Sequence, residues 1–407
     1  MRKYLKHINL LLIPAFMFAV LNNVQAQDMR ENMMKASASL LNKNYLSAVE
    51  YFSDAITQNS HDAELYLKRG NAYLLLEDYE NALSDFLKAE SMNNNNSLYP
   101  LARCYALMNE KGKAVFYLEK HLLTENKTPQ RILKTDEAFS NLYLSAEWKN
   151  LWKKDWYTES ENLLSEADYF LSSGKPEKAI EALNIADEKN QNSAQLFFLY
   201  AKALMAMGDN ASAITNINKA ITKNPSNAGY LQLRGDIYKK NKKIKLALKE
   251  YESALQLNPA NLHLLKEKAR AEADNKMFSE AIADFKMYLK YLPDDEEALY
   301  IYSGLLYEKK EYNEAQLLYN KIILLNPKSA QYLVARGNNF FMNKSYLSAE
   351  TDYNQALDLD PKNAEAYNNR ALCRMFLKNE KGACSDFKKA AALKFPGADE
   401  QLKKNCR

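Results

Sequence analysis

The sequence repeats itself with a period of 34 residues, and this period constrains the fold more than any other feature. Counted from residue 330, one unit has a small residue at position 8 (Gly337), alanine at positions 20 and 27 (Ala349, Ala356) and Pro361 at position 32. Seven units start at residues 160, 194, 228, 262, 296, 330 and 364 without an insertion. Three more start at 29, at 63 and near 95. Such a period indicates an array of similar supersecondary units.

Each unit has the pattern of two short amphipathic helices. Small residues at positions 8, 20 and 27 allow the two backbones to approach closely, and larger apolar residues at positions 4, 7, 11, 17 and 24 are expected to fill the space around them. The proline near position 32 ends the second helix, because its ring clashes with the preceding turn and it has no N–H to donate. One hairpin cannot bury its apolar face alone, so the sequence predicts an all-α solenoid of stacked hairpins.

These positions resemble those of the tetratricopeptide repeat (TPR) family, and in particular its secreted or periplasmic bacterial members. The resemblance implies a right-handed superhelix of helix-turn-helix units in two blocks, 29–128 with about three repeats and 160–396 with seven. His121, Tyr288 and Ile322 depart from it, since position 27 prefers alanine, and we expect looser or slightly rotated interfaces there. The implied function is a protein-interaction scaffold that binds a segment of a partner protein in its concave groove.

The first 26 residues have the features of a secretory signal peptide. Arg2, Lys3 and Lys6 precede an apolar stretch, 10–21, and Val24-Gln25-Ala26 supplies small residues before a cut at Gln27. A membrane anchor is the alternative, but twelve residues at about 1.5 Å each fall short of roughly 30 Å of hydrocarbon. No second apolar span follows, so we expect an exported protein, periplasmic or secreted, with no integral membrane segment after cleavage.

The charge balance and the lack of chemical motifs argue against several functions. The net charge is +4, and removal of the three leader cations leaves +1, so nucleic acid is not an expected partner. His61, His121 and His263 have no neighbouring Cys or His at metal-ligand spacing, and no motif for a nucleophile or a phosphate occurs. We therefore expect neither an enzyme nor a bound metal or cofactor.

The TPR resemblance also implies candidate partner-binding residues, because positions 2, 5, 9, 12 and 13 of each first helix project into the groove. They form a basic part and an aromatic part. The alternatives are solvated surface for the lysines and partial burial against neighbouring helices for the aromatic residues. The candidates are Lys202, Lys239, Lys240, Lys266 and Arg270 in the basic part, and Tyr300, Tyr307, Asn338, Phe341, Met342, Asn368, Met375 and Phe376 in the aromatic part.

One TPR subfamily grips the terminal carboxylate of a peptide with lysine and asparagine side chains. Asn338 and Asn369 match its two asparagine positions, but Val334 stands where the lysine is needed. No further repeat follows to supply the remaining cations. The clamp is therefore incomplete, and binding of that type is not expected.

All tryptophans of the chain lie in the segment 129–159, which does not follow the repeat. We expect a turn or short helix near 137–143 and a helix over about 146–157. On that helix Trp148, Trp152 and Trp156 would form one stripe, because they are spaced i, i+4, i+8. The segment resembles an insert of secreted bacterial TPR proteins, whose pattern here would comprise Asp136, Phe139, Leu142 and Trp148.

Two interpretations of the tryptophan segment remain open. The favoured one is a joint that covers the apolar face left at the end of the first block and fixes the angle between the blocks. The other is a surface that binds a partner or stacks on glycans, which would make the protein a carbohydrate-handling accessory. A purely structural spacer is a third possibility for the whole chain.

The C-terminal stretch 397–407 is expected to cap the array as a helix with Leu402 inward. Antiparallel arms about the turn near Phe395-Pro396 bring Cys384 and Cys406 level, but Cys373 is also level with Cys384 across its own hairpin. Many secreted TPR proteins look similar here, with a cysteine early in the last second helix and another near the chain end. This resemblance favours a Cys384–Cys406 disulfide, with Cys104 and Cys373 free.

Overall fold

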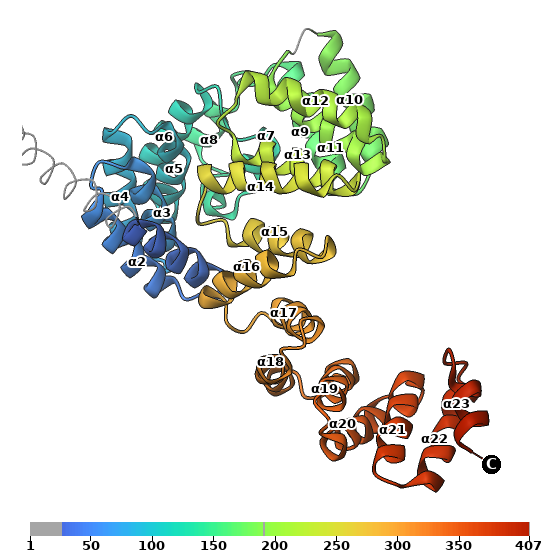
Figure 1. The fold of residues 1–407 in the computed structure, drawn as a ribbon. Coiled ribbons are helices and arrows are strands. Elements are labelled where there is room, and N and C mark those ends of the chain that lie inside the picture. The colour runs from blue at the N-terminus through green and yellow to red at the C-terminus, as the bar shows by residue number, and fades with distance from the viewer. Residues whose placement is uncertain (1–26, 190–191, 407) are drawn as a thin grey trace, which may run out of the picture. The chain divides into compact units, whose positions relative to one another are not determined.

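The described chain is an array of antiparallel helical hairpins (Figure 1). The computed structural model describes residues 27–189 and 192–406, so the expected signal peptide lies outside the described residues. Helices are the only regular structure over these ranges, which confirms the predicted all-α fold. Within the same ranges no helix combines the length and the hydropathy that crossing a bilayer requires. The chain divides into two compact units, 1–264 and 265–407, which are described separately.

The first unit contains three hairpins, a segment outside the repeat and three further hairpins. The helices of this unit are the stretch 27–41, α2 (Tyr45–Gln58), α3 (Ala63–Leu75), α4 (Tyr79–Ser91), η1 (Asn95–Ser97), α5 (Leu98–Leu107), α6 (Lys111–Leu122), α7 (Gln130–Thr135), η2 (Glu137–Phe139), α8 (Ala146–Leu151), α9 (Glu159–Ser172), α10 (Pro176–Glu188), α11 (Ala194–Met207), α12 (Asn210–Lys223), α13 (Ala228–Lys240) and α14 (Ile244–Leu257).

The second unit contains four hairpins and a terminal helix. Its first helix begins three residues before the boundary between the units. The helices are α15 (Leu262–Asp274), α16 (Phe278–Tyr291), α17 (Glu296–Glu308), α18 (Tyr312–Leu325), α19 (Ala330–Met342), α20 (Tyr346–Leu359), α21 (Ala364–Phe376), α22 (Glu380–Ala392) and α23 (Ala398–Asn405).

The turn inside most hairpins passes through a residue in the left-handed conformation at position 15. This conformation ends the first helix and reverses the chain, and glycine adopts it with least strain. Gly174 and Gly208 occupy the position in two hairpins. In several others the residue is a lysine with a φ near 60°, namely Lys43, Lys242, Lys276, Lys310, Lys344 and Lys378.

The small residue at position 8 lets a ring from the second helix pack against the backbone of the first. A Cβ added to Gly235 would lie 2.5 Å from a ring atom of Tyr251, and one added to Gly337 would lie 2.7 Å from the ring of Tyr353. Both tyrosines are fully buried. The predicted roles of position 8 as the small residue and of position 24 as the filling side chain are therefore confirmed.

The prediction of an apolar residue at position 7 is wrong in five hairpins, where a cation there bridges to the second helix. Its acidic partner stands sixteen residues later, at position 23. The pairs are Arg69–Asp85, Arg234–Glu250, Lys268–Asp284, Arg336–Asp352 and Arg370–Asp386. We call this set the position-7 bridge.

The bridge also reaches the preceding hairpin where its cation is arginine. Arg336 donates from Nε and Nη2 to both oxygens of Asp352, at 2.8 and 2.7 Å, and from Nη1 to Asn320 Oδ1 at 2.9 Å. The Asp352 side chain is only 3% exposed. A bidentate guanidinium therefore joins three helices, α18, α19 and α20, at one point.

The end of the array is covered by α23, as the sequence predicts. Leu402 packs against a buried cluster of Ala371, Ala383 and Phe387, while Lys403 and Lys404 are exposed. The structure contains the disulfide Cys384–Cys406, which connects α22 to the residue after α23.

The other two cysteines, Cys104 and Cys373, are free and buried. Burial raises the pKa of the Cys104 thiol to about 11 and that of Cys373 to about 12. Both therefore stay protonated at neutral pH, and neither is a reactive thiolate.

The position-7 bridge predicts an unequal response of two aspartates on α20. Asp352→Ala leaves the Arg336 guanidinium without its carboxylate, and we expect it to lower the free energy of unfolding by about 3 kcal/mol. Asp358→Ala, on the exposed face of the same helix, should change it by less than about 0.5 kcal/mol. Urea unfolding followed by circular dichroism measures both. Equal effects would show that the bridge does not stabilise the array.

The cap predicts a local loss of stability when its disulfide is removed. The bond closes a loop with a sequence separation of 22, so Cys384→Ser combined with Cys406→Ser should cost on the order of 3 kcal/mol. Hydrogen exchange of the α23 amides measures this loss, and α20 amides provide the internal control. Non-reducing peptide mapping checks the pairing, and a Cys373–Cys384 bridge or four free thiols would contradict it.

Candidate functional site

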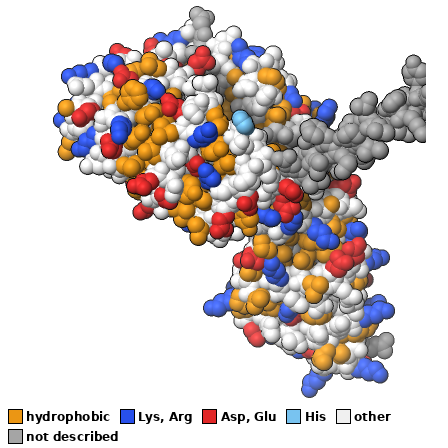
Figure 2. Space-filling view, turned by 90° about the vertical axis from the view of Figure 1, so that its left-hand side faces the viewer, with side chains coloured by type: hydrophobic (Ala, Val, Ile, Leu, Met, Phe, Trp, Pro, Cys, Tyr) orange, Lys and Arg blue, Asp and Glu red, His pale blue; other side chains and the backbone are white. Residues whose placement is uncertain are grey.

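A group of aromatic side chains reaches the surface of the second unit where α19 ends, α20 begins and α21 ends. Tyr346 stacks on Phe376 with ring centroids 4.4 Å apart, and Phe341 contacts both rings at 5.5 and 5.8 Å. Phe376 is 58% exposed, and Met342, at the end of α19, is 44% exposed. Phe341, Met342, Tyr346 and Phe376 are called the aromatic surface. Hydrophobic side chains also reach the solvent among charged ones on the face drawn in Figure 2.

Tyr300, Tyr307 and Met375 are half-buried, as Phe341 and Tyr346 are, but they pack on other partners. Tyr300 packs on Tyr332 with centroids 5.4 Å apart, and Tyr307 packs on Tyr312 at 5.8 Å. Both Tyr300 and Tyr307 are half-buried. Met375 packs against the cluster of Ala371, Ala383 and Phe387 under the cap. For these residues the structure fits partial burial better than a free binding face.

The two asparagine candidates are engaged within the fold. Asn338 donates to Glu365 Oε1 at 3.0 Å, and its own Oδ1 accepts from Tyr353 and Asn369 at 2.7 and 2.9 Å. Asn368 is only 8% exposed, and its amide donates to Asn369. The prediction that Asn368 projects into a groove is therefore wrong, because its side chain is buried in the hairpin contact.

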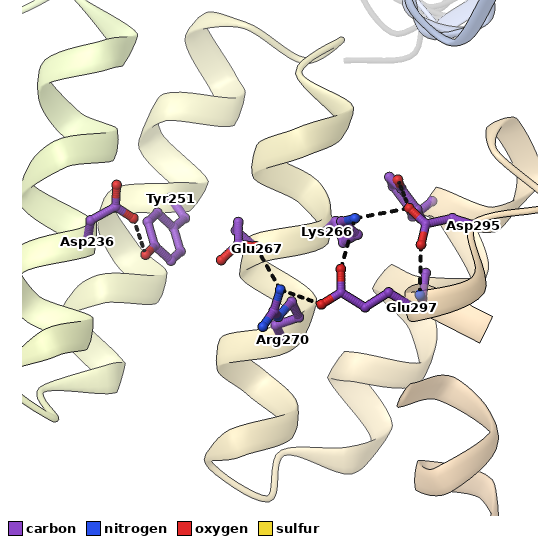
Figure 3. A network of polar contacts seen from close by, with 9 residues as sticks. Asp236, Tyr251, Lys266, Glu267, Arg270, Asp295 and Glu297 are labelled. Atoms are coloured by element: carbon purple, nitrogen blue, oxygen red, sulfur yellow. Dashed lines mark hydrogen bonds and ion pairs between the residues drawn. The ribbon is translucent and has the colours of Figure 1, made fainter. Parts of the chain in front are cut away.

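The basic candidates of the second unit form a network with acidic residues (Figure 3). Lys266 lies 3.0 Å from Asp295 and 3.2 Å from Glu297, and Arg270 lies 2.7 Å from Glu297. Burial acts to lower the pKa of Lys266, but the bonds to its two carboxylates outweigh burial and raise it. The charges of these cations are largely neutralised within the fold.

The basic candidates of the first unit also have partners. Lys202 pairs with Asp168 at 3.1 Å, and Lys240 donates to the Met205 carbonyl at 2.6 Å. Lys239 is engaged as well. The five cations that the sequence marks for binding are therefore mostly committed to contacts within the protein.

The tryptophan segment has the short helix predicted near 137–143, as η2 and the turns after it, but not the continuous helix predicted over about 146–157. The helix α8 ends at Leu151, and the expected extension to 157 is wrong, because the chain turns so that Trp156 Nε1 donates to the Leu151 carbonyl at 2.8 Å. An indole thus satisfies a carbonyl that the helix end leaves open. The three indoles do not form one helical stripe.

All three indoles nevertheless pack on the same core, which the second and third hairpins provide. Trp148 is 7% exposed, Phe139 and Leu142 are fully buried, and Trp152 and Trp156 lie against them as partly buried neighbours. The segment therefore covers the open end of the third hairpin. The segment also contacts α9, because Arg131 of α7 lies over the ring of Tyr169, and Lys127, just before the segment, pairs with Glu161 at 2.9 Å. These contacts favour the joint over a free stacking surface.

A polar group holds the start of this segment against α5 and α6. Tyr99 donates to Asp136 at 2.5 Å, and Arg103 lies 2.9 Å from the same carboxylate. His121 stacks on Tyr99, and its Nε2 accepts the Thr128 N–H at 2.8 Å, which leaves the proton of the neutral ring on Nδ1. Burial lowers the pKa of His121 to about 4.

His121, Tyr288 and Ile322 are buried, and the looser or slightly rotated interfaces expected there stay a prediction. These side chains are 6%, 4% and 0% exposed, so the core accommodates them in place of alanine. His121 borders a polar cavity of about 600 Å³, lined also by Glu90, Lys120 and several asparagines. No group of three or more His, Cys, Asp or Glu residues arranged to hold a metal ion occurs in the ranges that the structure covers.

The fold and its surfaces define a class of protein: a helical-hairpin array with exposed apolar side chains. One family model described as tetratricopeptide repeat matches residues 33–97, 164–228, 198–261 and 233–296, and a second model with the same description matches 272–337. These matches cover more than half of the chain. The protein belongs to the tetratricopeptide repeat family, whose arrays serve as protein-interaction scaffolds.

The solved structures that match this chain have low sequence identity to it. The C-terminal part of a TPR repeat-containing protein from Cytophaga hutchinsonii is 18% identical, with a TM-score of 0.54, over 60% of this chain and 99% of that one. A TPR protein from Parabacteroides merdae is 21% identical, with a TM-score of 0.43, over 61% and 99%. YrrB, titled a TPR protein with an unusual peptide-binding site, is 19% identical, with a TM-score of 0.41, over 46% and 95%. No curated protein matches.

Sequence reasoning missed the contribution of the half-buried Tyr346 to the aromatic surface. It stands at position 17, which was assigned to the core, and an aromatic residue also occupies this position at Tyr45, Tyr79, Phe278 and Tyr312. The recurrence was therefore visible, but the period alone does not show that Tyr346 meets Phe376 of the next hairpin.

The low pKa of His121 predicts a loss of stability in acid. The unfolded chain binds a proton near the ordinary value of 6.5, whereas the folded chain resists protonation down to about 4. Stability therefore falls as the pH drops through this window, by on the order of 2 kcal/mol. The comparison is wild type against His121→Gln, which cannot titrate, in urea unfolding at pH 7 and pH 4.5. If the difference between the two proteins is the same at both values, His121 is not responsible.

Proposed function

We propose that the protein is an exported scaffold whose aromatic surface binds a segment of a partner protein. The single observation that carries this proposal is a set of mutually packed rings, the half-buried Phe341 and Tyr346 and the exposed Phe376, with the exposed Met342 next to Phe341 in the chain. Contiguous exposed aromatic and methionine side chains are typical of binding surfaces, and aromatic residues supply much of the binding energy at such surfaces.

Two ion pairs between helices stabilise the hairpins that carry the aromatic surface. Arg336–Asp352 and Arg370–Asp386 bridge the hairpins that carry the aromatic side chains, each with N···O distances of 2.7 Å. The rings already stack on one another. Binding of a partner therefore costs little of the side-chain entropy of these rings. A pre-formed surface of this kind suits a short apolar segment.

The partner segment is expected to present an aliphatic or aromatic anchor residue. Asn338 donates to Glu365 near this surface, and the cations Lys266 and Arg270 are paired elsewhere in the same unit. We expect apolar contact to dominate at the aromatic surface, while the exposed turn lysines Lys344 and Lys378 follow Met342 and Phe376 by two residues. Met342 can adapt to anchors of different shape, because its side chain is unbranched and flexible.

Export rests on the signal-peptide pattern of residues 1–26. The Cys384–Cys406 disulfide supports it, since structural disulfides persist in oxidising compartments such as the periplasm. A cytoplasmic location would keep this pair reduced. The redox state of the pair in protein isolated from its own cell therefore tests export separately from partner binding.

The carbohydrate-handling alternative loses support from the tryptophan segment. Trp148 is buried, and the N–H of Trp156 is bonded to the backbone of α8. Sugar stacking requires an exposed indole face, and the packing of these rings on the core offers little of one.

The aromatic surface predicts a selective loss of partner capture. Met342→Ser combined with Phe376→Ser removes two exposed apolar side chains and should reduce crosslinked capture of the native partner at least about tenfold, since each contact at such a surface contributes 1 kcal/mol or more. The matched control is Leu317→Ser with Leu324→Ser, which are 69% and 82% exposed on α18. Both double variants should remain helical by circular dichroism. Unchanged capture by the first variant, or equal loss in both, would rule out this surface.

A further inference from the structure

Two cations on α7, Arg131 and Lys134, differ from the other basic residues considered for binding. Arg131 lies over the ring of Tyr169 on α9, with its Cζ 4.5 Å from the ring centroid. Lys134 lies over the ring of Trp152, with its Nζ at 4.7 Å. Neither side chain has an acidic partner in the ranges that the structure covers, and both are exposed.

The contrast with the cations that the sequence favours is direct. Lys202, Lys266 and Arg270 each contact a carboxylate of the protein itself. Arg131 and Lys134 are held by aromatic faces instead, which orient a cation without neutralising its charge. These two residues therefore keep their hydrogen-bond donors available to a ligand.

A shallow cavity lies at the same place, between α7 and α9. Its volume is about 340 Å³. Beside Tyr169 its lining combines two cations, one carboxylate and three neutral polar side chains: Arg131, Lys134, Glu166, Gln130, Asn162 and Ser165.

The geometry assigns a ligand class to this α7–α9 surface: we propose that it binds the carboxylate side chains of an acidic peptide segment. A guanidinium stacked on a ring keeps the N–H groups of its edge free, and these match a carboxylate in bidentate fashion. Lys134 supplies a second cation on the next turn of α7. The amide and hydroxyl side chains of Gln130, Asn162 and Ser165 fit the backbone groups of an extended peptide.

A peptide fits this surface better than a nucleic acid does. The lining contains two cations, Arg131 and Lys134, and one carboxylate, Glu166. Its net charge is therefore +1. A phosphate backbone carries a dense and continuous charge that two cations cannot match. The whole chain has a net charge of only +4, so no extended basic face is expected to assist.

This inference does not rest on the proposed function. The α7–α9 surface belongs to the first unit and the aromatic surface to the second. A synthetic peptide tests binding at the α7–α9 surface without the native partner of the aromatic surface. The two proposals can therefore fail independently.

The test uses the purified protein and a fluorescein-labelled peptide of alternating Glu and Gly with an amidated C-terminus. Fluorescence anisotropy should detect binding at low salt that weakens as salt is added, because exposed charges are screened. The same peptide with Gln in place of Glu should not bind. A failure of the acidic peptide to bind at low salt would overturn the proposal.

Variants locate the binding. Arg131→Gln with Lys134→Gln should weaken it roughly tenfold, about threefold for each lost contact. Tyr169→Ala should weaken it without a change of net charge, because Arg131 loses its support, whereas Tyr169→Phe should retain it. The charge-matched control is Lys43→Gln with Lys242→Gln, two exposed turn lysines of the same unit.

Three outcomes contradict the proposal. Equal weakening in the charge-matched control would show that net charge acts and not this surface. Undiminished binding by both the Tyr169→Ala variant and the double variant Arg131→Gln, Lys134→Gln would show that the peptide binds at another site. Tighter binding of a single-stranded oligonucleotide than of the acidic peptide, lost in the same variants, would assign the surface to nucleic acid.

Discussion

The stacking of one helical hairpin on the next is the interaction on which the rest of this structure depends. Within a hairpin, the position-24 ring packs on the small residue at position 8, as Tyr353 does on Gly337. That contact leaves one apolar face for a neighbour to cover. Wherever the repeat stops, another element has to take the neighbour's place. The tryptophan segment does so after the third hairpin, and α23 does so after the last one.

The same constraint explains where the surfaces for other molecules lie. A side chain that projects sideways from the stack is not needed for stacking and is free to vary. Phe376 and Met342 are such side chains at the ends of their helices. Arg131 lies outside the repeat, on a short helix whose Leu133 is buried in the core beneath. Both surfaces are therefore additions to a scaffold whose own stability lies elsewhere.

Much of the fold could be predicted from the sequence, because the 34-residue period and the sizes of the residues at fixed positions determine the helical hairpin. Small residues at positions 8 and 20 recur in nearly every unit, and they specify a hairpin without knowledge of its neighbours. The cap could also be predicted, because the stretch 397–407 follows the last unit and can form a helix with Leu402 turned inward. In each of these cases the physical cause lies within one unit or at its edge.

The candidate site could be predicted only in part, because its properties depend on partners far apart in the chain. Lys266 was expected to be a free cation, but Asp295 and Glu297 neutralise it from 29 and 31 residues away. Asn368 was expected at the surface, but the hairpin contact buries it. The position-7 bridge was missed for a related reason: hydrophobic pattern analysis assigns no role to an arginine whose acid stands sixteen residues later.

The hairpins of the second unit are not joined to one another by the same chemistry. Arg336 and Arg370 each donate to an asparagine of the preceding hairpin, but Tyr302 holds the equivalent position in α17. There α15 is linked to the start of α17 by the ion pairs of Lys266 and Arg270 with Asp295 and Glu297. The Arg270–Glu297 pair is 40% and 48% exposed, so dissolved ions reach it and screen it. Added salt is therefore expected to weaken this pair more than the largely buried Lys266–Asp295 pair beside it, and more than the amide links further along.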